Sequence, residues 1–454
     1  MRKLGKSLEV LAMSFECQTF ALEDCLEALI DYRGKTPEKT NSGVPLITAK
    51  VIKGGRIETP TEFIAVENYD SWMRRGIPKC GDVVLTVEAP LGEVAQLGPE
   101  KIALAQRVVT LRGKSGFLDS TYLLYWLQSQ DAQEQLKARA SGTTVIGIKQ
   151  SELRKLAVPI PPFEQQIEVA QILSVLDERI ALLRETNSTL ESIAQAMFKS
   201  WFVDFDPVRA KSEGKLPEGI DEATARLFPD TFEETELGMV PKGWAIKTLD
   251  DITERITKGT TPTTLKRPFV ASGINFVKAE SMTGDGGFIP NKFAFIDEET
   301  HQLLNRSQLR AGDILISIAG TIGRIAVMTD EFLPANTNQA VAILRPITKI
   351  FPGELINKFL RLEATQRAMN EKVVQAVQAN LSLGTLSSLK LSIPPEGDIE
   401  KLFDSGFDQI EKSWTANEQR VRTLSILRNT LLPRLVSGQL RISVAETELE
   451  KTTA

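Results

Sequence analysis

The chain has 454 residues, two to three times the size of a usual domain, so two or three folded units are expected. Hydrophobic residues make up 42% and charged residues 25% of the chain, which excludes a fibrous or a disordered protein. Three cysteines without a Cys-x-x-Cys pair, and a single histidine, His301, argue against a disulfide framework, most zinc sites and most histidine-based catalysis.

The sequence contains no signal for export or membrane insertion. The longest apolar run, residues 314–323, has about ten residues, whereas roughly 18 are needed to span a bilayer. Glu9 and Glu16 interrupt what would be the apolar core of a signal peptide. We therefore expect a cytoplasmic protein that makes no contact with a membrane.

The net charge of −5 disfavours a nucleic-acid partner, but the charge is unevenly distributed. Residues 33–155 contain 18 lysines and arginines against 13 acidic residues, and residues 255–391 contain 16 against 11, so each segment has a net charge of +5. Two basic blocks between acidic connectors predict two separate footprints on a polyanion. Ordinary scatter of surface charge is the alternative.

Five short phrases recur in the same order further along the chain, which indicates an internal duplication. The offset is nearly constant, and the pairs are 33–37 with 258–262, 43–47 with 273–277, 80–86 with 311–317, 92–95 with 323–326, and 160–162 with 393–395. We predict two copies of a unit of about 200 residues, joined by a loop-rich stretch.

Each copy begins with short aliphatic and β-branched runs separated by Gly, Pro and Asp, a pattern typical of strands and turns. The clearest runs are residues 83–87, 108–111, 314–318 and 341–344. This pattern predicts a mixed α+β globule. After the Pro-Pro pair the pattern of both copies becomes helical.

The two helical stretches carry apolar residues at alternating steps of four and three, which is typical of a coiled-coil seam. The first seam is Val169, Leu173, Leu176, Ile180, Leu183, Asn187, Leu190, Ala194, Met197 and Trp201, and the second is Phe403, Phe407, Ile410, Trp414, Asn417, Val421, Leu424, Arg428, Leu431 and Leu435. The polar Asn187 and Asn417 are expected to fix the register at a cost in stability. Two long helices in a local bundle are the alternative.

The motifs that resemble catalytic sites are incomplete. Gly34-Lys35-Thr36 resembles the end of a phosphate-binding loop, but Leu29 replaces the required first glycine and Pro37 follows. Residues 160–163 lack the polar first residue of an amino-methyltransferase site, and no acidic-x-Lys follows Pro229-Asp230 to complete a nuclease site. His301 lies in a polar, helical run and is expected to face solvent. We find no catalytic constellation and no metal site.

Basic and polar side chains are interleaved in the two matched blocks, and such side chains contact phosphates and base edges. The candidate DNA-binding residues are Arg33, Lys35, Lys50, Lys53, Arg56, Arg74 and Arg75 in the first block, and Lys258, Thr260, Thr261, Lys266, Arg267, Lys278 and Arg324 in the second. Gln106 and Gln339 also match between the copies, although a hydrogen bond at a strand end explains them equally well.

The combination of these features resembles the specificity subunit of type I restriction-modification systems, over nearly the whole chain. The phrases that are most typical of that family are Ser200-Trp-Phe-Val-Asp-Phe-Asp-Pro-Val-Arg-Ala-Lys211, Pro161-Pro-Phe-Glu-Gln-Gln166 and Pro241-Lys-Gly-Trp244. The resemblance implies an α+β fold with two globular target recognition domains, related by a pseudo-twofold duplication and separated by two long helices in an antiparallel coiled coil.

The resemblance also implies domain boundaries and partners. The expected order is a first recognition domain (1–160), a central spacer helix (161–205), a linker (206–240), a second recognition domain (241–393), a C-terminal spacer helix (394–440) and a tail (441–454). The implied partners are double-stranded DNA with a bipartite target, two modification (methyltransferase) subunits, and motor/restriction subunits. S-adenosylmethionine, ATP and Mg are expected on those partner subunits, with no cofactor in this non-catalytic chain.

Two other functions remain as alternatives to the specificity subunit. A duplicated protein-protein scaffold would not bind DNA, and the salt dependence of duplex binding would distinguish it. A fused methyltransferase or nuclease would need the catalytic motifs that are missing from this sequence.

Overall fold

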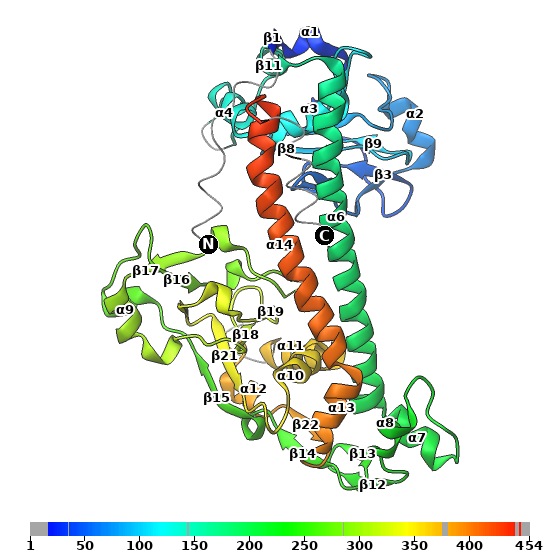
Figure 1. Ribbon diagram of the computed structural model, residues 1–454, viewed down its shortest axis with the longest axis vertical. Helices are drawn as coiled ribbons and strands as arrows, with labels where there is room; N and C mark the ends of the chain where they lie inside the picture. The colour runs from blue at the N-terminus through cyan, green and yellow to red at the C-terminus, as the bar shows by residue number, and fades with distance from the viewer. Residues whose placement is uncertain are drawn as a thin grey trace. The chain divides into compact units, whose positions relative to one another are not determined.

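The computed structural model describes residues 17–34, 36–142, 145–284, 286–374, 380–440 and 445. The chain forms two compact units, residues 1–185 with 417–454, and residues 186–416 (Figure 1). Among the described residues, no helix has both the length and the apolar character needed to cross a membrane.

The first unit contains an antiparallel four-stranded sheet with the order β2-β10-β7-β8, and a three-stranded sheet with the order β6-β3-β9. Strand β3 pairs with β9 in parallel. The strands are β1 (Gln18–Ala21), β2 (Leu26–Asp31), β3 (Val44–Ile47), β4 (Ile52–Lys53), β5 (Arg56–Ile57), β6 (Phe63–Ile64), β7 (Val83–Val87), β8 (Leu91–Gln96), β9 (Ala103–Leu104), β10 (Val108–Gly113) and β11 (Ala157–Ile160). Because β1 pairs with β11, the two ends of this domain meet.

Short helices cover the sheets of the first unit. They are α1 (Leu22–Cys25), α2 (Tyr69–Trp72), α3 (Ser120–Gln128), α4 (Gln130–Ala138) and α5 (Gln150–Leu153). Helix α3 lies in the core because its residues 122–127 are all buried. The residue before it, Asp119, caps the helix, because its carboxylate accepts a hydrogen bond from the backbone N–H of Tyr122.

The second unit repeats this topology, with a four-stranded sheet of order β15-β21-β18-β19 and a three-stranded sheet of order β17-β16-β20. Its strands are β14 (Ala245–Thr248), β15 (Thr253–Lys258), β16 (Ile274–Val277), β17 (Ala294–Ile296), β18 (Ile314–Ser317), β19 (Ile325–Val327), β20 (Ala335–Thr337), β21 (Val341–Pro346) and β22 (Lys390–Ile393), and its domain helices are α9 (Glu298–Leu303), α10 (Gly353–Arg361), α11 (Glu363–Val374) and α12 (Leu383–Ser387). The predicted internal duplication is confirmed.

The duplication extends to single buried ion pairs. In the first unit the Arg112 guanidinium donates from Nε to Asp82 Oδ1 at 2.7 Å, and in the second Arg345 makes the same contact with Asp313 at 2.7 Å. Each aspartate also accepts the backbone N–H of the residue three positions before it, at 2.8 Å. The aspartate of each recurring Gly-Asp phrase therefore joins an arginine of the neighbouring strand to the turn that precedes the aspartate.

The segment between the copies, which we expected to be rich in loops, contains regular helices and strands. It contains α7 (Asp206–Ser212), α8 (Glu222–Arg226) and the hairpin of β12 (Phe232–Thr235) and β13 (Gly238–Pro241). Trp201 packs edge-on against Phe228 and Phe407, with ring centroids 5.5 Å apart in both pairs. This aromatic cluster lies in the core of the second unit, so residues 206–240 belong to that unit and not to a loose linker.

Two long helical segments run through both units. Helix α6 (Phe163–Lys199) is continuous over 37 residues, and a π-helical turn (Ser200–Asp204) follows it. The second segment consists of α13 (Asp398–Gly406) and α14 (Asp408–Val436). The helix expected over 394–440 therefore begins at Asp398, ends at Val436 and is distorted at Phe407, where φ is −109°, although the Phe407 N–H still donates to the Phe403 carbonyl at 2.8 Å. A Cβ on Gly406 would lie 2.6 Å from the Trp201 ring, so the tryptophan occupies the space of a side chain there.

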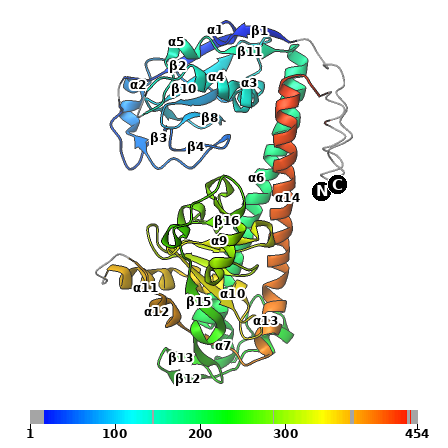
Figure 2. The same cartoon turned by 90° about the vertical axis from the view of Figure 1, so that its left-hand side faces the viewer.

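The long helices pack against each other in both units, and both views show α6 and α14 side by side (Figures 1 and 2). In the second unit the Asn187 side chain donates to the Trp414 carbonyl at 3.2 Å, and Trp201 contacts Phe407. Asn187 meets Trp414, whereas Trp201, further along the chain, meets the earlier residue Phe407. The two helices are therefore antiparallel. In the first unit Asp177 pairs with Arg428 at 2.9 Å.

The predicted seam residues lie inside these contacts. The buried ones are Leu173, Leu176, Ile180, Leu183, Asn187, Phe407, Asn417, Val421 and Leu424, and the half-buried ones are Leu190, Ile410 and Trp414. In the first unit the seam shares one apolar core with α3, so the helix pair also serves as a platform for the domain.

The joint between the first domain and α6 depends on Gln166, which is fully buried. Its Oε1 accepts the Asp119 N–H, and its Nε2 donates to the carbonyls of Phe117 and Pro161, each at 2.9 Å. One side chain therefore connects the start of α6 to the loop that begins α3. When the two Ile-Pro-Pro phrases are aligned, the equivalent position in the second copy is the buried Ile399, which packs by apolar contact.

Candidate nucleic-acid interface

The first group of candidate cations in the first unit lies after β2 and after α2. Arg33 pairs with Asp31 at 2.6 Å and donates to the Ile148 carbonyl at 2.7 Å. Arg75 donates from Nη1 to the carbonyls of Asp31 and Arg33 at 3.1 and 2.7 Å, while Arg74 is exposed. Arg33 and Arg75 are thus brought together and held in place. Lys35 lies outside the described residues.

The second group in this unit lies on and beside the hairpin β4–β5. The Lys53 ammonium pairs with Glu58 at 2.7 Å, and Lys50 lies 3.7 Å from Glu62 with its side chain 81% exposed. The turn uses Gly54 and Gly55, both with positive φ, and the Gly54 N–H donates to the Glu93 carboxylate. The hairpin therefore presents its lysines at a fixed turn.

Arg56 differs from the other cations of this hairpin because its side chain is half-buried. Burial lowers its pKa, the nearby Arg184 and Arg428 add to this lowering, and Asp177 opposes it. All three of these residues lie on the long helices. Arg56 thus lies close to the helix pair, unlike the exposed Lys53.

A cavity of about 550 Å³ lies between this hairpin, β8, α3 and α6. Its charged lining residues are Arg56 with four acids, Glu58, Glu100, Asp177 and Glu178. This excess of negative charge disfavours the cavity as a site for a nucleic acid.

The first group in the second unit lies at the end of β15 and on the 3₁₀ turn Pro262–Leu265. The Thr260 N–H donates to the Thr337 carbonyl at 3.1 Å, and the Thr261 hydroxyl donates to the Gln339 side chain. A Cβ on Gly259 would lie 2.0 Å from the Thr337 oxygen, so only glycine fits between these segments. The recurring Lys-Gly-Thr-Thr-Pro phrase is therefore a loop fixed against β20.

The cations of this loop differ in their surroundings. Lys258 and Lys266 are exposed, and Lys266 has a left-handed backbone with φ of 58°. Arg267 forms a two-pronged pair with Glu299, which raises the pKa of its guanidinium. The loop consequently has two exposed ammonium groups, next to a charged guanidinium that is already paired with a carboxylate.

Lys278 and Arg324 form the second group of this unit. The Lys278 ammonium lies 5.2 Å from the centre of the Phe269 ring and 3.7 Å from Glu280. Arg324 donates to the Met282 carbonyl at 2.9 Å, so part of its donor capacity is used within the domain.

Arg324 also shows how the copies diverge. Its backbone N–H donates to the Ser317 hydroxyl, just as the Glu93 N–H donates to the Thr86 hydroxyl in the first unit, both at 2.9 Å. Each is the second residue of the recurring phrase at 92–95 and 323–326, so Glu93 and Arg324 occupy equivalent positions with opposite charges. The two copies present different chemistry on the same backbone frame.

Sequence reasoning missed Arg107, which pairs with Glu88 at 3.4 Å. Glu88 is bridged to Gly147, next to the Ile148 carbonyl that accepts from Arg33. Only the fold joins these distant segments, although Arg107 directly follows the matched Gln106. In the part of the chain that the structure describes, no group of three or more His, Cys, Asp or Glu side chains is arranged to hold a metal ion.

Comparison with known proteins identifies the duplicated domain. The model of the type I restriction modification DNA specificity domain matches residues 16–192 and again 241–424. The chain is 28% identical to the Type I restriction enzyme HindI specificity subunit of Haemophilus influenzae, over 70% of this chain and 77% of that protein. It is 25% identical to the MjaIX specificity subunit of Methanocaldococcus jannaschii, over 81% and 79%.

A solved structure has the same fold. The S subunit of a Type-I restriction-modification system from M. genitalium superposes with a TM-score of 0.52 at 17% identity, over 93% of this chain and 96% of that one.

Proposed function

Because this chain belongs to the family of type I restriction-modification specificity subunits, we propose that each of its two copies reads one half of a bipartite target in double-stranded DNA. The family's domain recognises a DNA target, and the chain is a non-catalytic specificity subunit. The duplicated-scaffold alternative is not favoured.

The divergence of the two copies on one shared frame supports the proposal most directly. Both copies have four-stranded and three-stranded sheets with the same strand order, yet Glu93 in the first copy corresponds to Arg324 in the second. Base edges are distinguished by the donors and acceptors that face them. Two domains with the same strand order but different side chains are therefore expected to recognise two half-sites of different sequence.

The proposed phosphate contacts are the exposed lysines of these frames. Lys50 and Lys53 lie beside the first hairpin, and Lys258 and Lys266 lie on the second loop. Phosphate contacts position a protein on the duplex, whereas polar groups such as the two threonines of the second loop suit contacts with base edges. The candidate cations that donate to carbonyls of their own domain support this surface.

The chain works within a complex with other subunits, as specificity subunits of type I systems do. We propose that two modification subunits and motor/restriction subunits complete it in the cytoplasm, and that these subunits bind S-adenosylmethionine, ATP and Mg. On α6, Val175 and Leu182 are about half exposed and lie seven residues, or one heptad, apart, so they lie on one face of the helix in the first unit. Such an apolar stripe suits a partner helix.

The salt dependence of duplex binding by the complete complex tests the proposal. Between about 50 and 200 mM salt, the logarithm of the affinity should fall linearly with the logarithm of the salt concentration, because phosphate contacts release counterions. A random duplex should bind with a similar slope but more weakly. A flat salt response, or equal affinity for all sequences, would contradict a DNA specificity role.

A further inference from the structure

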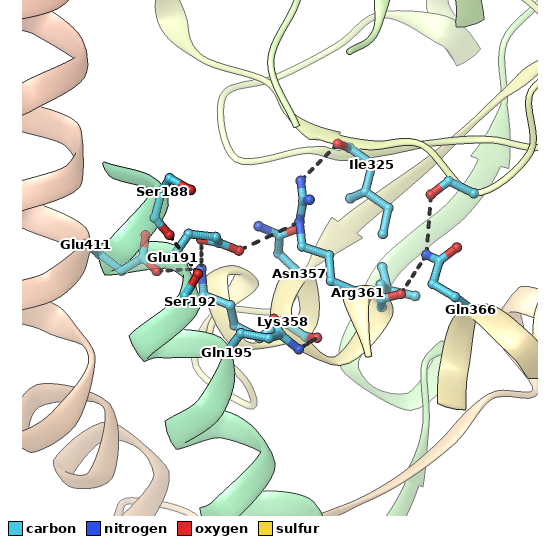
Figure 3. Close-up of polar contacts among 12 residues, drawn as sticks. Ser188, Glu191, Ser192, Gln195, Ile325, Asn357, Lys358, Arg361, Gln366 and Glu411 are labelled. Atoms are coloured by element: carbon cyan, nitrogen blue, oxygen red, sulfur yellow. Dashed lines mark hydrogen bonds and ion pairs between the residues drawn. The ribbon is translucent and has the colours of Figure 1, made fainter. Parts of the chain in front are cut away.

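Lys358 of α10 connects the second domain to both long helices (Figure 3). Its side chain is 3% exposed, and its Nζ lies 2.5 Å from Glu191 Oε2 on α6 and 3.1 Å from Glu411 Oε1 on α14. All three residues belong to the second unit. One ammonium group therefore bridges three helices that are far apart in the sequence.

Lys358 and a second cation face Glu191 and Glu411, and Glu354 of α10 is a further carboxylate near Glu411. Arg361, one turn further along α10, lies 4.0 Å from Glu191 and donates to the Ile325 carbonyl at 3.1 Å. The Gln195 side chain of α6 donates to the Lys358 carbonyl at 3.0 Å. Two cations thus face two carboxylates, and Figure 3 shows these side chains converging between the helices.

The first copy bridges the same position with different chemistry. Helices α3 and α10 are equivalent and of equal length, and Tyr125 holds the position in α3 that Lys358 holds in α10. The Tyr125 hydroxyl donates to Asp177 Oδ2 on α6 at 3.0 Å, and the cation is Arg428 of α14, 2.9 Å from Asp177 Oδ1. The shared feature is the three-helix bridge and not the residue type. A side chain that only filled space would not need this polar connection in both copies.

A polar bridge constrains orientation in a way that the neighbouring apolar core does not. Apolar burial is non-directional, so a domain that is held by it alone can tilt or slide on a helix pair. The Lys358 ammonium can contact carboxylates on both long helices only while α10 stays close to both of them. Lys358 itself is the buried charge, with its side chain 3% exposed against 33% for Glu191 and 24% for Glu411, so an arrangement that separates it from these carboxylates leaves a buried ammonium without a partner and is penalised.

We propose that Lys358 is a positioning residue that fixes the orientation of the second recognition domain on the helix pair, and thereby the number of unread base pairs that the complex accepts between its half-sites. This inference rests on the proposed function. It assigns Lys358 no contact with DNA.

The test replaces Lys358 in the full chain, within its complex, and maps the methylated sequences. For K358M we expect both half-sites to stay unchanged, while sites with one base pair more or fewer between them become methylated. The ratio of affinities for the matched duplex and one lengthened by a base pair should fall about tenfold, as expected for a lost charged hydrogen bond. The control is K412M, because Lys412 is exposed and pairs with Asp408 on its own helix.

The outcomes separate positioning from stability. Weaker methylation with a single spacing in K358M would assign Lys358 a structural role only and overturn the inference. Should K358M fail to fold, the variant K358M/E191Q/E411Q takes its place, because removing a buried ion together with its partners is less costly than removing one partner, and Arg361 keeps its hydrogen bonds to Asn357 and the Ile325 carbonyl. A single spacing in that variant, or its failure to fold, also overturns the inference. If the unaltered complex methylates no bipartite sequence, the proposed function itself fails.

Discussion

Lys53 illustrates, at the scale of single residues, what a phosphate contact should look like on this chain. Its ammonium is exposed and its pair with Glu58 is between two solvated side chains, which costs little to break. Glu58 holds the lysine near the hairpin turn without burying it. Lys53 can therefore exchange this carboxylate for a phosphate.

Replacing Lys53 with alanine should weaken DNA binding evenly across sequences, because a phosphate contact carries no sequence information. The slope of log affinity against log salt should decrease by about one. Binding titrations at several salt concentrations, on specific and random duplexes, measure both effects. A loss confined to one base of the target would instead assign Lys53 to base reading.

Asp313 represents the other class of charged residue, which stabilises the frame. Its side chain is 1% exposed, and it pairs with Arg345 through two contacts of 2.7 Å. Replacing it with asparagine leaves the Arg345 guanidinium, whose side chain is 12% exposed, without its carboxylate and should lower the free energy of unfolding by about 3 kcal/mol. Chemical denaturation of the full chain measures this.

The matched control for Asp313 is Asp408, whose pair with Lys412 is solvated and lies within one helix. Replacing Asp408 with asparagine should cost below about 1 kcal/mol. Equal losses for the two variants would mean that the buried anchor contributes no more than a surface pair.

At the scale of helices and strands, periodicity predicted the elements that have a strong local signal. The run of residues 83–87 is β7, and the spacing that begins at Val169 lies within α6. The close approach of the Trp201 ring to Gly406, beside the distorted Phe407, was not predictable, because the two segments meet only in the fold. The ordered connector escaped prediction for a similar reason, since its stability comes from long-range contacts with aromatic residues.

The candidate site was predictable only as a list of residue types. The sequence identified Arg33 and Arg75 but not that Arg75 donates to the Arg33 carbonyl, since 42 residues separate them. Nor did it distinguish the half-buried Arg56 from the exposed Lys53, because local sequence does not reveal which cation faces the helices. Side-chain direction at these positions is a tertiary property.

The length of α6 should set the spacing of the half-sites. Inserting four residues into it adds about 6 Å of rise and breaks the heptad register locally. At about 3.4 Å per base pair, with part of the rise lost to rearrangement, the spacer should lengthen by one or two base pairs while both half-sites keep their sequence. A map of methylated sequences measures this.

A seven-residue insertion is the control for register, because it preserves the heptad pattern. It adds about 10 Å of rise and should lengthen the spacer by about three base pairs. The original spacing at full activity in either variant would contradict the role of the helices as a ruler.

At the scale of the whole molecule, the positive charge expected to contact DNA is concentrated in the two recognition domains. The blocks 33–155 and 255–391 each have a net charge of +5 within a chain of net charge −5, so positive charge is concentrated in the two copies. The acidic remainder includes the connector and α6, whereas α14 has five basic and three acidic residues. This distribution favours contact with DNA through the two recognition domains and disfavours contact elsewhere.

The most direct test of the central claim exchanges one block only. Residues 33–155 are replaced by the corresponding block of a relative with a different target, and the methylated sequence of a host that carries the complete system is mapped. We predict that one half-site changes to that of the relative, while the other half-site and the spacing stay the same. A simultaneous change of both halves would contradict independent reading by the two copies.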